Sequence, residues 1–415
     1  MNQQLSIPSF PFPLDWLPTD ACLVGGTVRD ALLNRKRKEF DLDLVVIDRA
    51  VELARDLANR CNAGFVVLDA ARDIARIVFE QGTVDVAKIE GESLEQDLYR
   101  RDFTINSIAL HIQSQKLIDP LAGKEDLEAK LIKMVSSANL KADPLRLFRA
   151  YRQAAQLNFT IDPQTRETIT QLASELKNVA PERIKTELSY LLETGKGSVY
   201  LQQAWEDGLL SVCFPSATQQ QVEQATKIDV AKQTLCQGYP DFSETWEKNV
   251  GGQSNPFDSL AKLACLVSVS PEEAENQLTE LKFSRAEIRT VTSSLSLLPR
   301  LLEERVETMT LRDRYFFFQE ARNVFPCLVL TAMAKGLTLE AAKPLLEHYL
   351  NPDDPVAYPQ PIVSGKDLLR SLSLSPSPRI GELLTELQIA YIEGKVNSPS
   401  EAIDLAKSWL YSNSK

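Results

Sequence analysis

The distribution of strand-like and helix-like segments along the chain most narrows what it can fold into. Up to about residue 135, short apolar segments such as 21–24 and 40–47 alternate with amphipathic ones such as 50–63. In the amphipathic segments the apolar residues recur three and four positions apart, which is typical of helices. After Ala142 every periodic segment has this helical spacing. The sequence therefore predicts an α/β domain followed by a long all-α remainder.

Composition narrows the classes of function. Two histidines, His111 and His348, in 415 residues argue against histidine metal clusters and against a histidine-dependent hydrolase. The six cysteines include no C-x-x-C pair, which is typical of reduced thiols in a cytoplasmic protein. No apolar run approaches the roughly 20 residues that span a bilayer, and the N-terminal segment lacks a secretory pattern. We therefore predict a cytoplasmic protein with no membrane partner, whose metal chemistry must depend on carboxylates.

The net charge of −11 is opposite to that of most proteins with a broad nucleic-acid-binding face. Local basic patches can still bind nucleic acid, because charges act over short distances. Three basic clusters occur: residues 34–38, Arg100 with Arg101, and Arg146 with Arg149 and Arg152. Each cluster alone could equally be a solvated face or a set of ion pairs.

Two aspartates interrupt an otherwise apolar strand signal, "FDLDLVV". Asp41 and Asp43 are two residues apart, so on a strand their side chains share one face. Leu42 and Leu44 then share the opposite face, where a core can take them. Neighbouring carboxylates repel each other unless a cation lies between them. The pair indicates either a strand with a polar face or a carboxylate site for a divalent ion such as Mg²⁺, which prefers oxygen ligands.

A glycine pair precedes this strand. Gly25 and Gly26 follow the first apolar segment, and glycines at a strand-to-helix turn let backbone N–H groups approach a phosphate. Arg29 follows three residues later, where its guanidinium could bind a phosphate oxygen. Asp85, on a later strand, is either a third carboxylate or a polar residue at a strand edge. Combined, these residues indicate a nucleoside-triphosphate site with two-metal chemistry.

Several motifs occur in the order and approximate spacing of one family. They are LVGGTVRDALL, FDLDLVV, RRDFTINSIAL, DPLAGKEDL, DPLRLFRAYRQAAQLNF and ERIKTEL, within about residues 20–190. The chain resembles the bacterial class II tRNA nucleotidyltransferase and poly(A) polymerase family. The resemblance implies an α/β nucleotidyltransferase head followed by an all-α neck, body and tail that hold tRNA. We expect the head at 1–135, the neck at 136–200, the body at 201–300 and a tRNA-binding tail at 301–415.

The resemblance also implies roles for individual residues. Asp41 and Asp43 match the catalytic metal ligands. Gly26 and Arg29 match the triphosphate-binding positions, and Gly25 adjoins them. The other positions that match nucleotide-binding or neighbouring motif residues are Arg101, Asp102, Asn106, Asp143, Arg146, Arg149 and Arg152.

Asp143 and Arg146 match the pair that selects the incoming base. An aspartate accepts from the exocyclic amino group of cytosine or adenine, while an arginine donates to the ring nitrogen beside it. Uracil and guanine present a carbonyl at the position of that amino group, so the carboxylate rejects them. Asp143, followed by Pro144, is also a good helix N-cap that would hold the pair rigidly. Arginines three residues apart drift around a helix by about 60° per step, so Arg152 cannot face the same point as Asp143.

The chain departs from the family pattern at several points. Ala142 replaces the glutamate usual before Asp143, Ala122 replaces a usual glycine, and Gln153 stands where phenylalanine is favoured. Only residues 92–99 separate "VDVAKIEG" from "RRDF". Family members that complete the whole CCA end have a longer flexible segment there, so the short link favours the CC-adding branch.

The sequence therefore predicts a Mg²⁺-dependent enzyme that adds C residues to the 3′ end of tRNA without a template. CTP is the substrate, pyrophosphate leaves, and ATP is a second substrate if the whole CCA end is made. A separate A-adding enzyme would otherwise complete the same tRNA. The alternatives are a full CCA-adding enzyme, an A-adding enzyme, a poly(A) polymerase, a non-catalytic RNA-binding relative, or a transferase that modifies a protein or small molecule.

Overall fold

The computed structural model describes residues 9–35, 39–195, 197–242, 256–303, 306–373 and 375–412. The chain divides into two compact units, Met1–Cys213 and Phe214–Lys415. This division is coarser than the predicted head, neck, body and tail, whose boundaries stay predictions. Three residues of the basic cluster at 34–38 lie outside the described residues. Across the described ranges, no helix is both long and apolar enough to cross a membrane.

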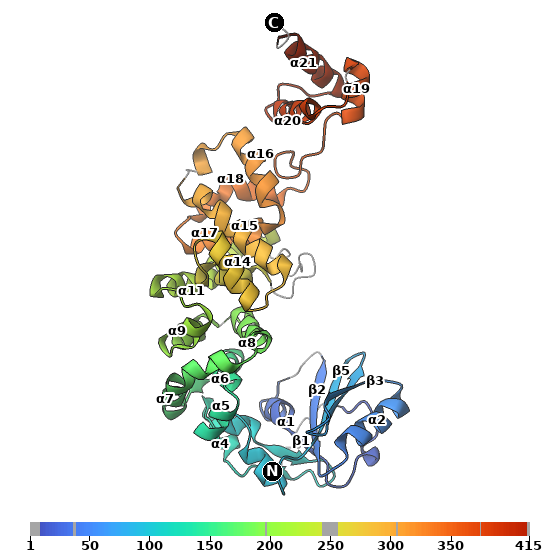
Figure 1. Ribbon diagram of the computed structural model, residues 1–415, viewed down its shortest axis with the longest axis vertical. Coiled ribbons are helices and arrows are strands. Elements are labelled where there is room, and N and C mark those ends of the chain that lie inside the picture. The colour runs from blue at the N-terminus through green and yellow to red at the C-terminus, as the bar shows by residue number, and fades with distance from the viewer. Residues whose placement is uncertain are drawn as a thin grey trace. The chain divides into compact units, whose positions relative to one another are not determined.

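A seven-stranded sheet forms the head of the first unit (Figure 1). Strands β2 and β5 pair in parallel at its centre, and every other neighbouring pair is antiparallel. The strand order is β3-β4-β5-β2-β1-β6-β7. The strands are β1 (Cys22–Val24), β2 (Phe40–Val46), β3 (Gly64–Asp69), β4 (Ile74–Phe79), β5 (Gly82–Lys88), β6 (Ala109–His111) and β7 (Leu117–Ile118).

The alternation of side chains along β2 and β5 separates a core face from a polar face. Leu42 and Leu44 are at most 1% exposed, and Val84 and Val86 are fully buried on β5. Helix α2 packs against β4 and β5 and contributes Leu57 to this core. Burying a leucine or valine stabilises a fold by about 1.5–3 kcal/mol, which fixes the register of the two strands. The head helices are α1 (Gly25–Leu32), α2 (Ala50–Cys61), α3 (Leu94–Tyr99) and α4 (Gly123–Glu128).

Helices complete the first unit. In α6, Phe148 and Tyr151 are fully buried. The Tyr151 hydroxyl donates to Asp207, which also accepts from Arg166 Nε at 2.6 Å, so a buried polar cluster ties α6 to α7 and to the end of α9. These helices are α5 (Ser137–Ala142), α6 (Leu145–Leu157), α7 (Pro163–Leu172), α8 (Pro181–Glu193), α9 (Gly197–Glu206) and α10 (Leu209–Cys213).

The described part of the second unit is helical throughout, without a strand. Side chains cap its helices: Thr218 with Gln221 and Ser284 with Glu287 form capping boxes. Its last three helices enclose a core of their own. The helices are α11 (Gln219–Gly238), α13 (Phe257–Leu266), α14 (Pro271–Glu280), α15 (Arg285–Leu302), α16 (Leu311–Ala321), α17 (Phe325–Ala334), α18 (Leu339–Leu350), α19 (Gly365–Leu372), α20 (Pro378–Ile392) and α21 (Pro399–Ser412). The predicted fold class, an α/β head followed by an all-α remainder, is confirmed.

Candidate active site

A pocket of about 1000 Å³ lies in the first unit. The head lines it with α1, β2 and β5, and the helical part lines it with α6 and α8. The structure brings all twelve predicted site residues to this one pocket, although it does not by itself test their roles: Gly25, Gly26, Arg29, Asp41, Asp43, Arg101, Asp102, Asn106, Asp143, Arg146, Arg149 and Arg152.

Strand β2 presents two carboxylates to the pocket. Asp41 and Asp43 share one face of the strand, and Asp43 pairs in register with Asp85 on β5. Thr83 Oγ1 donates to Asp41 Oδ1 at 2.8 Å. Arg76 donates to both oxygens of Asp85, at 2.7 and 2.8 Å. This ion pair favours the interpretation of Asp85 as a structural polar residue, because both of its oxygens are already engaged.

The electrostatics of Asp43 indicate a site that a cation would complete. Burial, and then the neighbouring charge of Asp41, raise its pKa from 3.8 to about 6, although Arg101 lowers it in part. A divalent ion would relieve this repulsion. Among the described residues, no group of three or more histidines, cysteines and carboxylates could hold a metal. Two carboxylates alone fit Mg²⁺, which retains water and takes further oxygen ligands from substrate phosphates.

Gly25 lets the backbone approach this carboxylate. Its φ is +67°, in the left-handed region that favours glycine. A Cβ atom there would lie 3.2 Å from Asp43 Oδ2 and 3.3 Å from Arg101 Nη1. Helix α1 is assigned from Gly25, directly after Val24, so Gly25 itself makes the predicted turn between strand and helix. The backbone reverses within the first helical residues because Gly25 can adopt this conformation.

Arg29 is buried rather than extended into the pocket. Its Nε and Nη2 atoms lie 2.9 and 2.8 Å from Asp30 Oδ1, and its Nη1 donates to Asn106 Oδ1 at 2.9 Å. The residue is 8% exposed. An arginine held this firmly offers a fixed positive charge at one wall of the pocket.

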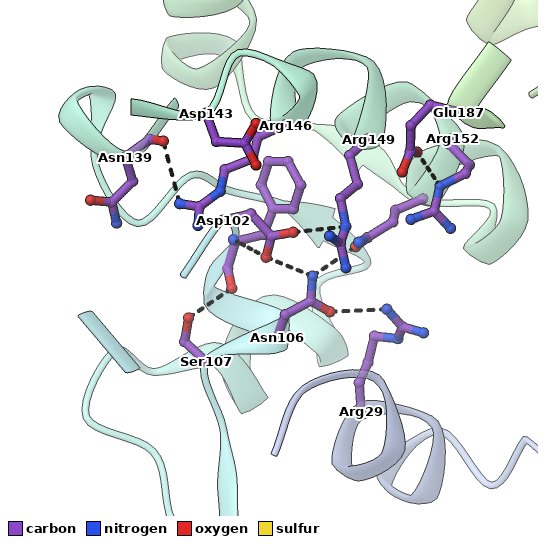
Figure 2. Close-up of polar contacts among 12 residues, drawn as sticks. Arg29, Asp102, Asn106, Ser107, Asn139, Asp143, Arg146, Arg149, Arg152 and Glu187 are labelled. Carbon is purple, nitrogen blue, oxygen red and sulfur yellow. Dashed lines mark hydrogen bonds and ion pairs between the residues drawn. The ribbon is translucent and has the colours of Figure 1, made fainter. Parts of the chain in front are cut away.

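Asn106 joins three segments of the chain (Figure 2). Besides accepting from Arg29, it donates from Nδ2 to Asp102 Oδ1 at 2.9 Å and to Gln153 Oε1 at 3.0 Å. Arg149 Nε lies 3.0 Å from Asp102 Oδ2. This network connects α1, the segment after α3, and α6. Gln153 was not predicted as a site residue, and the signal that could have identified it is its departure from the usual phenylalanine.

Asp102 stays ionised within this network. Burial raises the pKa of Asp102, but the Arg149 guanidinium and hydrogen bonds from Asn106 and the Phe103 N–H outweigh that effect, so the pKa lies below its usual range. The carboxylate in turn raises the pKa of Arg149. The network therefore carries the same charges at any pH near neutrality.

Asp143 and Arg146 lie at the start of α6 (Figure 2), and protein partners hold both side chains. Arg146 Nη1 donates to the carbonyl oxygens of Arg100 at 2.9 Å and Asn139 at 3.3 Å. Arg183 Nη2, from α8, donates to Asp143 Oδ2 at 3.1 Å. Arg183, which sequence reasoning missed, thus holds Asp143 although Ala142 replaces the usual glutamate.

The predicted N-cap role of Asp143 is wrong. Pro144 occupies the N-cap position of α6, and no side chain caps that helix. Asp143 instead ends α5, and its backbone carbonyl, not its carboxylate, accepts from the Arg146 N–H at 3.0 Å. The carboxylate is directed to Arg183, which places it on the pocket wall.

Two further arginines are engaged at other walls of the pocket. Arg101 donates from Nε and Nη2 to Asp97 Oδ2, at 3.1 and 2.9 Å. Arg152 on α6 donates to Glu187 on α8 and from Nη1 to Gln156 Oε1 at 2.9 Å. Its guanidinium carbon lies 5.8 Å from the centre of the Tyr190 ring.

The short link before "RRDF" is an ordered helix. Ser93 caps α3 by accepting from the Gln96 N–H at 3.3 Å. Asp97, inside α3, accepts from the Glu90 N–H at 3.0 Å and holds Arg101. The link is therefore fixed at both ends to the wall of the pocket.

Comparisons with known proteins agree with this architecture. Three family models match: "Poly A polymerase head domain" at residues 21–133, "Probable RNA and SrmB- binding site of polymerase A" at 158–221, and "tRNA nucleotidyltransferase domain 2 putative" at 257–406. The solved structure of a Thermotoga maritima CCA-adding enzyme complexed with tRNA is similar in fold, with a TM-score of 0.73 and 23% identity. That likeness covers 94% of this chain and 91% of the other.

Two curated relatives span nearly the whole chain. A CC-adding tRNA nucleotidyltransferase of Synechocystis sp. is 47% identical over 411 residues, covering 96% of this chain and 95% of that protein. An A-adding tRNA nucleotidyltransferase of Deinococcus radiodurans is 32% identical, covering 96% and 97%. From this identity and coverage, the chain belongs to the tRNA nucleotidyltransferase and poly(A) polymerase family and is an enzyme, a nucleotidyltransferase.

Proposed function

We propose that this enzyme adds C residues to the 3′ end of tRNA and stops at CC. The observation that carries the proposal is the short link 92–99, in which Asp97 accepts from the Glu90 N–H and pairs with Arg101. A site that must change shape to accept ATP after CTP needs a wall that can move. The link with α3 forms this wall, and the hydrogen bonds of Asp97 hold it in place. The 47% identity to a CC-adding relative supports the same specificity.

Enzymes of this family are generally metal-dependent, and Asp41 and Asp43 would hold the ions. Mg²⁺ suits them, because both ligands are carboxylate oxygens on a rigid central strand. Bound there, divalent ions would activate the attacking 3′-hydroxyl and stabilise the leaving pyrophosphate. The carboxylates fix where the α-phosphorus of CTP and the tRNA 3′-hydroxyl meet.

The other residues bind the nucleotide. Gly25 and Gly26 bring the start of α1 close to the triphosphate, where helix N–H groups favour anions. Arg29 and Arg101 supply fixed positive charge, each held by a carboxylate partner. Asp143 accepts from the cytosine amino group, and Arg146 donates to the ring nitrogen. Because Arg183 uses one oxygen of Asp143, the other remains to accept from the base.

A full CCA-adding activity is the alternative that the base-selecting pair itself permits, because cytosine and adenine present the same amino group and ring nitrogen. We infer that the fixed link, rather than the base-selecting pair, excludes ATP. The partners of the enzyme are then tRNA, CTP and a separate A-adding enzyme that completes the same tRNA in the cytoplasm.

Incorporation on three tRNAs tests the proposal. Transcripts that end before the first C, after the first C and after CC are each given labelled CTP or ATP with Mg²⁺. We expect C addition to the first two, no addition of A to the third, and no activity in Asp41→Ala. Efficient addition of A to the CC-ended tRNA would overturn CC specificity, and no addition to any tRNA would overturn the proposed function as a whole.

A further inference from the structure

At one end of the pocket lie residues to which the proposed function gives no role in binding the incoming nucleotide. This end is lined by Arg152 and Gln156 on α6 and by Glu187, Tyr190 and Thr194 on or just after α8. Tyr190 is the only aromatic residue among the described residues that line the pocket. Tyr190 is 48% exposed although it lines a pocket wall. A half-exposed aromatic ring at such a wall offers a surface on which a planar ligand can stack.

The ring of Tyr190 is supported from within the protein. Arg152 places its guanidinium 5.8 Å from the ring centre, a cation–π contact. Glu187 and Gln156 hold that guanidinium, so it is fixed in place under the ring (Figure 2 shows the Arg152–Glu187 pair). No described residue accepts from or donates to the Tyr190 hydroxyl, so among the described residues the Arg152 contact is what supports the ring. Arg152, predicted from the sequence to bind nucleotide, is therefore positioned to support Tyr190.

The position of Tyr190 separates it from the base-selecting pair. Arg152 lies six residues beyond Arg146 on α6, which is about 9 Å along the helix axis. Tyr190 contacts Arg152 rather than Arg146, so we assign its ring to a different base from the one that Asp143 and Arg146 contact. Arg149 and Gln153, between the two ends, belong to the network beside the carboxylates. The order along α6 is thus base selection, reaction centre and then the Tyr190 surface.

The reaction needs a second nucleotide in this pocket. Its 3′-hydroxyl must reach the α-phosphorus of the incoming CTP, so the last nucleotide of the RNA acceptor has to lie next to the reaction centre. We propose that Tyr190, supported by Arg152, forms the subsite that stacks on the base of this 3′-terminal nucleotide. This inference rests on the proposed function, because it takes RNA as the acceptor. Stacking tolerates any base, as a site that receives a different terminal base at each addition requires.

A fluorescent terminal base tests the stacking directly. The probe is a tRNA that ends before the first C and carries 2-aminopurine as its last base, whose emission falls when it stacks. We expect the wild-type protein and Tyr190→Phe to quench the emission, and Tyr190→Ala to leave it unquenched at saturating protein. Tyr200→Ala is the matched control, because Tyr200 is a partly exposed tyrosine of the first unit that does not line the pocket. Quenching by Tyr190→Ala equal to that of the wild type would overturn the proposal.

Steady-state kinetics supply the second readout. Removal of a stacked base contact costs about 1–3 kcal/mol, so the KM for tRNA should rise about fivefold or more in Tyr190→Ala. The KM for CTP should stay within about twofold of the wild type. A rise confined to the KM for CTP would place the ring against the incoming nucleotide and overturn the subsite. Transfer by the wild type is measured in the same experiment, so a failure of the proposed function is seen separately as a wild type that adds no C to any tRNA.

Discussion

The proposed metal-binding end of the pocket, at Asp41 and Asp43, and the proposed base-selecting end, at Asp143 and Arg146, differ in how their charges are balanced. On β2, Asp43 is half-buried beside Asp41, and partial burial and the charge of Asp41 raise its pKa to about 6. At the start of α6, Asp143 is paired with Arg183, and Arg146 is bound to two backbone carbonyls. The difference indicates that a cation must complete the metal-binding end, whereas the base-selecting end is formed before the nucleotide arrives.

Neutralising Asp43 should have the largest effect. Asp43→Asn removes a charged metal ligand, and the loss of several kcal/mol of transition-state stabilisation should lower kcat for C addition about a thousandfold. The assay is single-turnover C addition at saturating CTP and Mg²⁺. Activity within tenfold of the wild type would show that β2 does not hold the catalytic metal.

The same substitution should make the metal-free protein more stable at neutral pH. Because the folded-state pKa of Asp43 is about 6 and its ordinary value is 3.8, stability falls as pH rises through this window. Asparagine carries no charge, so the gain should be present above pH 6 and shrink toward pH 4. Thermal unfolding in EDTA at pH 7.5 and pH 5 measures this gain in stability. A variant that is less stable than the wild type at pH 7.5 would contradict the electrostatic account of Asp41 and Asp43.

Asp143→Ala should have the next largest effect, on selection rather than on rate. A well-placed base contact contributes about 1–3 kcal/mol of discrimination, so the preference for CTP over UTP should fall by about tenfold or more while some transfer remains. The ratio of kcat/KM for the two nucleotides measures this. A variant that keeps full discrimination against UTP would remove Asp143 from base selection.

Arg183→Ala should have a smaller effect on the same ratio. Asp143 and Arg183 are partly exposed, and such an ion pair contributes only about 0.2–1 kcal/mol, so we expect a change of up to about fivefold. Arg183→Lys should restore most of the discrimination if the charge is what positions Asp143. An effect as large as that of Asp143→Ala would instead mean that Arg183 contacts the nucleotide itself.

Gln153→Met should have the smallest effect. It keeps the side-chain volume but removes the oxygen that accepts from Asn106 Nδ2, which still donates to Asp102. We expect a loss of about 1 kcal/mol in the free energy of unfolding and no more than a few-fold change in the KM for CTP. Denaturant unfolding and initial rates measure both. A large change in nucleotide selection would show that the network, and not Arg183 alone, positions the base-selecting end.

The strand face of the site could be predicted because its geometry is local. Alternation alone places Asp41 and Asp43 together and buries Leu42 and Leu44. The helical face was predicted less well. The partners Arg183 and Gln153 reach the site through tertiary packing of α6 and α8, which spacing along the sequence does not reveal.

Local rules also failed where tertiary contacts prevailed. Asp143 before Pro144 has the sequence of an N-cap, yet Arg183 takes its carboxylate. Ala122, which replaces a usual glycine, keeps a left-handed backbone with φ of +54°, because Asp119 accepts from the Gly123 and Lys124 N–H groups and fixes the turn. The conformation that favours glycine is thus retained without it.

Equilibrium binding of CTP and UTP, with Mg²⁺ and with EDTA, tests the contrast between the two ends most directly. The base-selecting end is formed without the cation, so removal of Mg²⁺ should weaken both nucleotides by the same factor and leave their ratio of affinities unchanged. A preference for CTP that disappears in EDTA would contradict the account, because base selection would then depend on the metal-binding end.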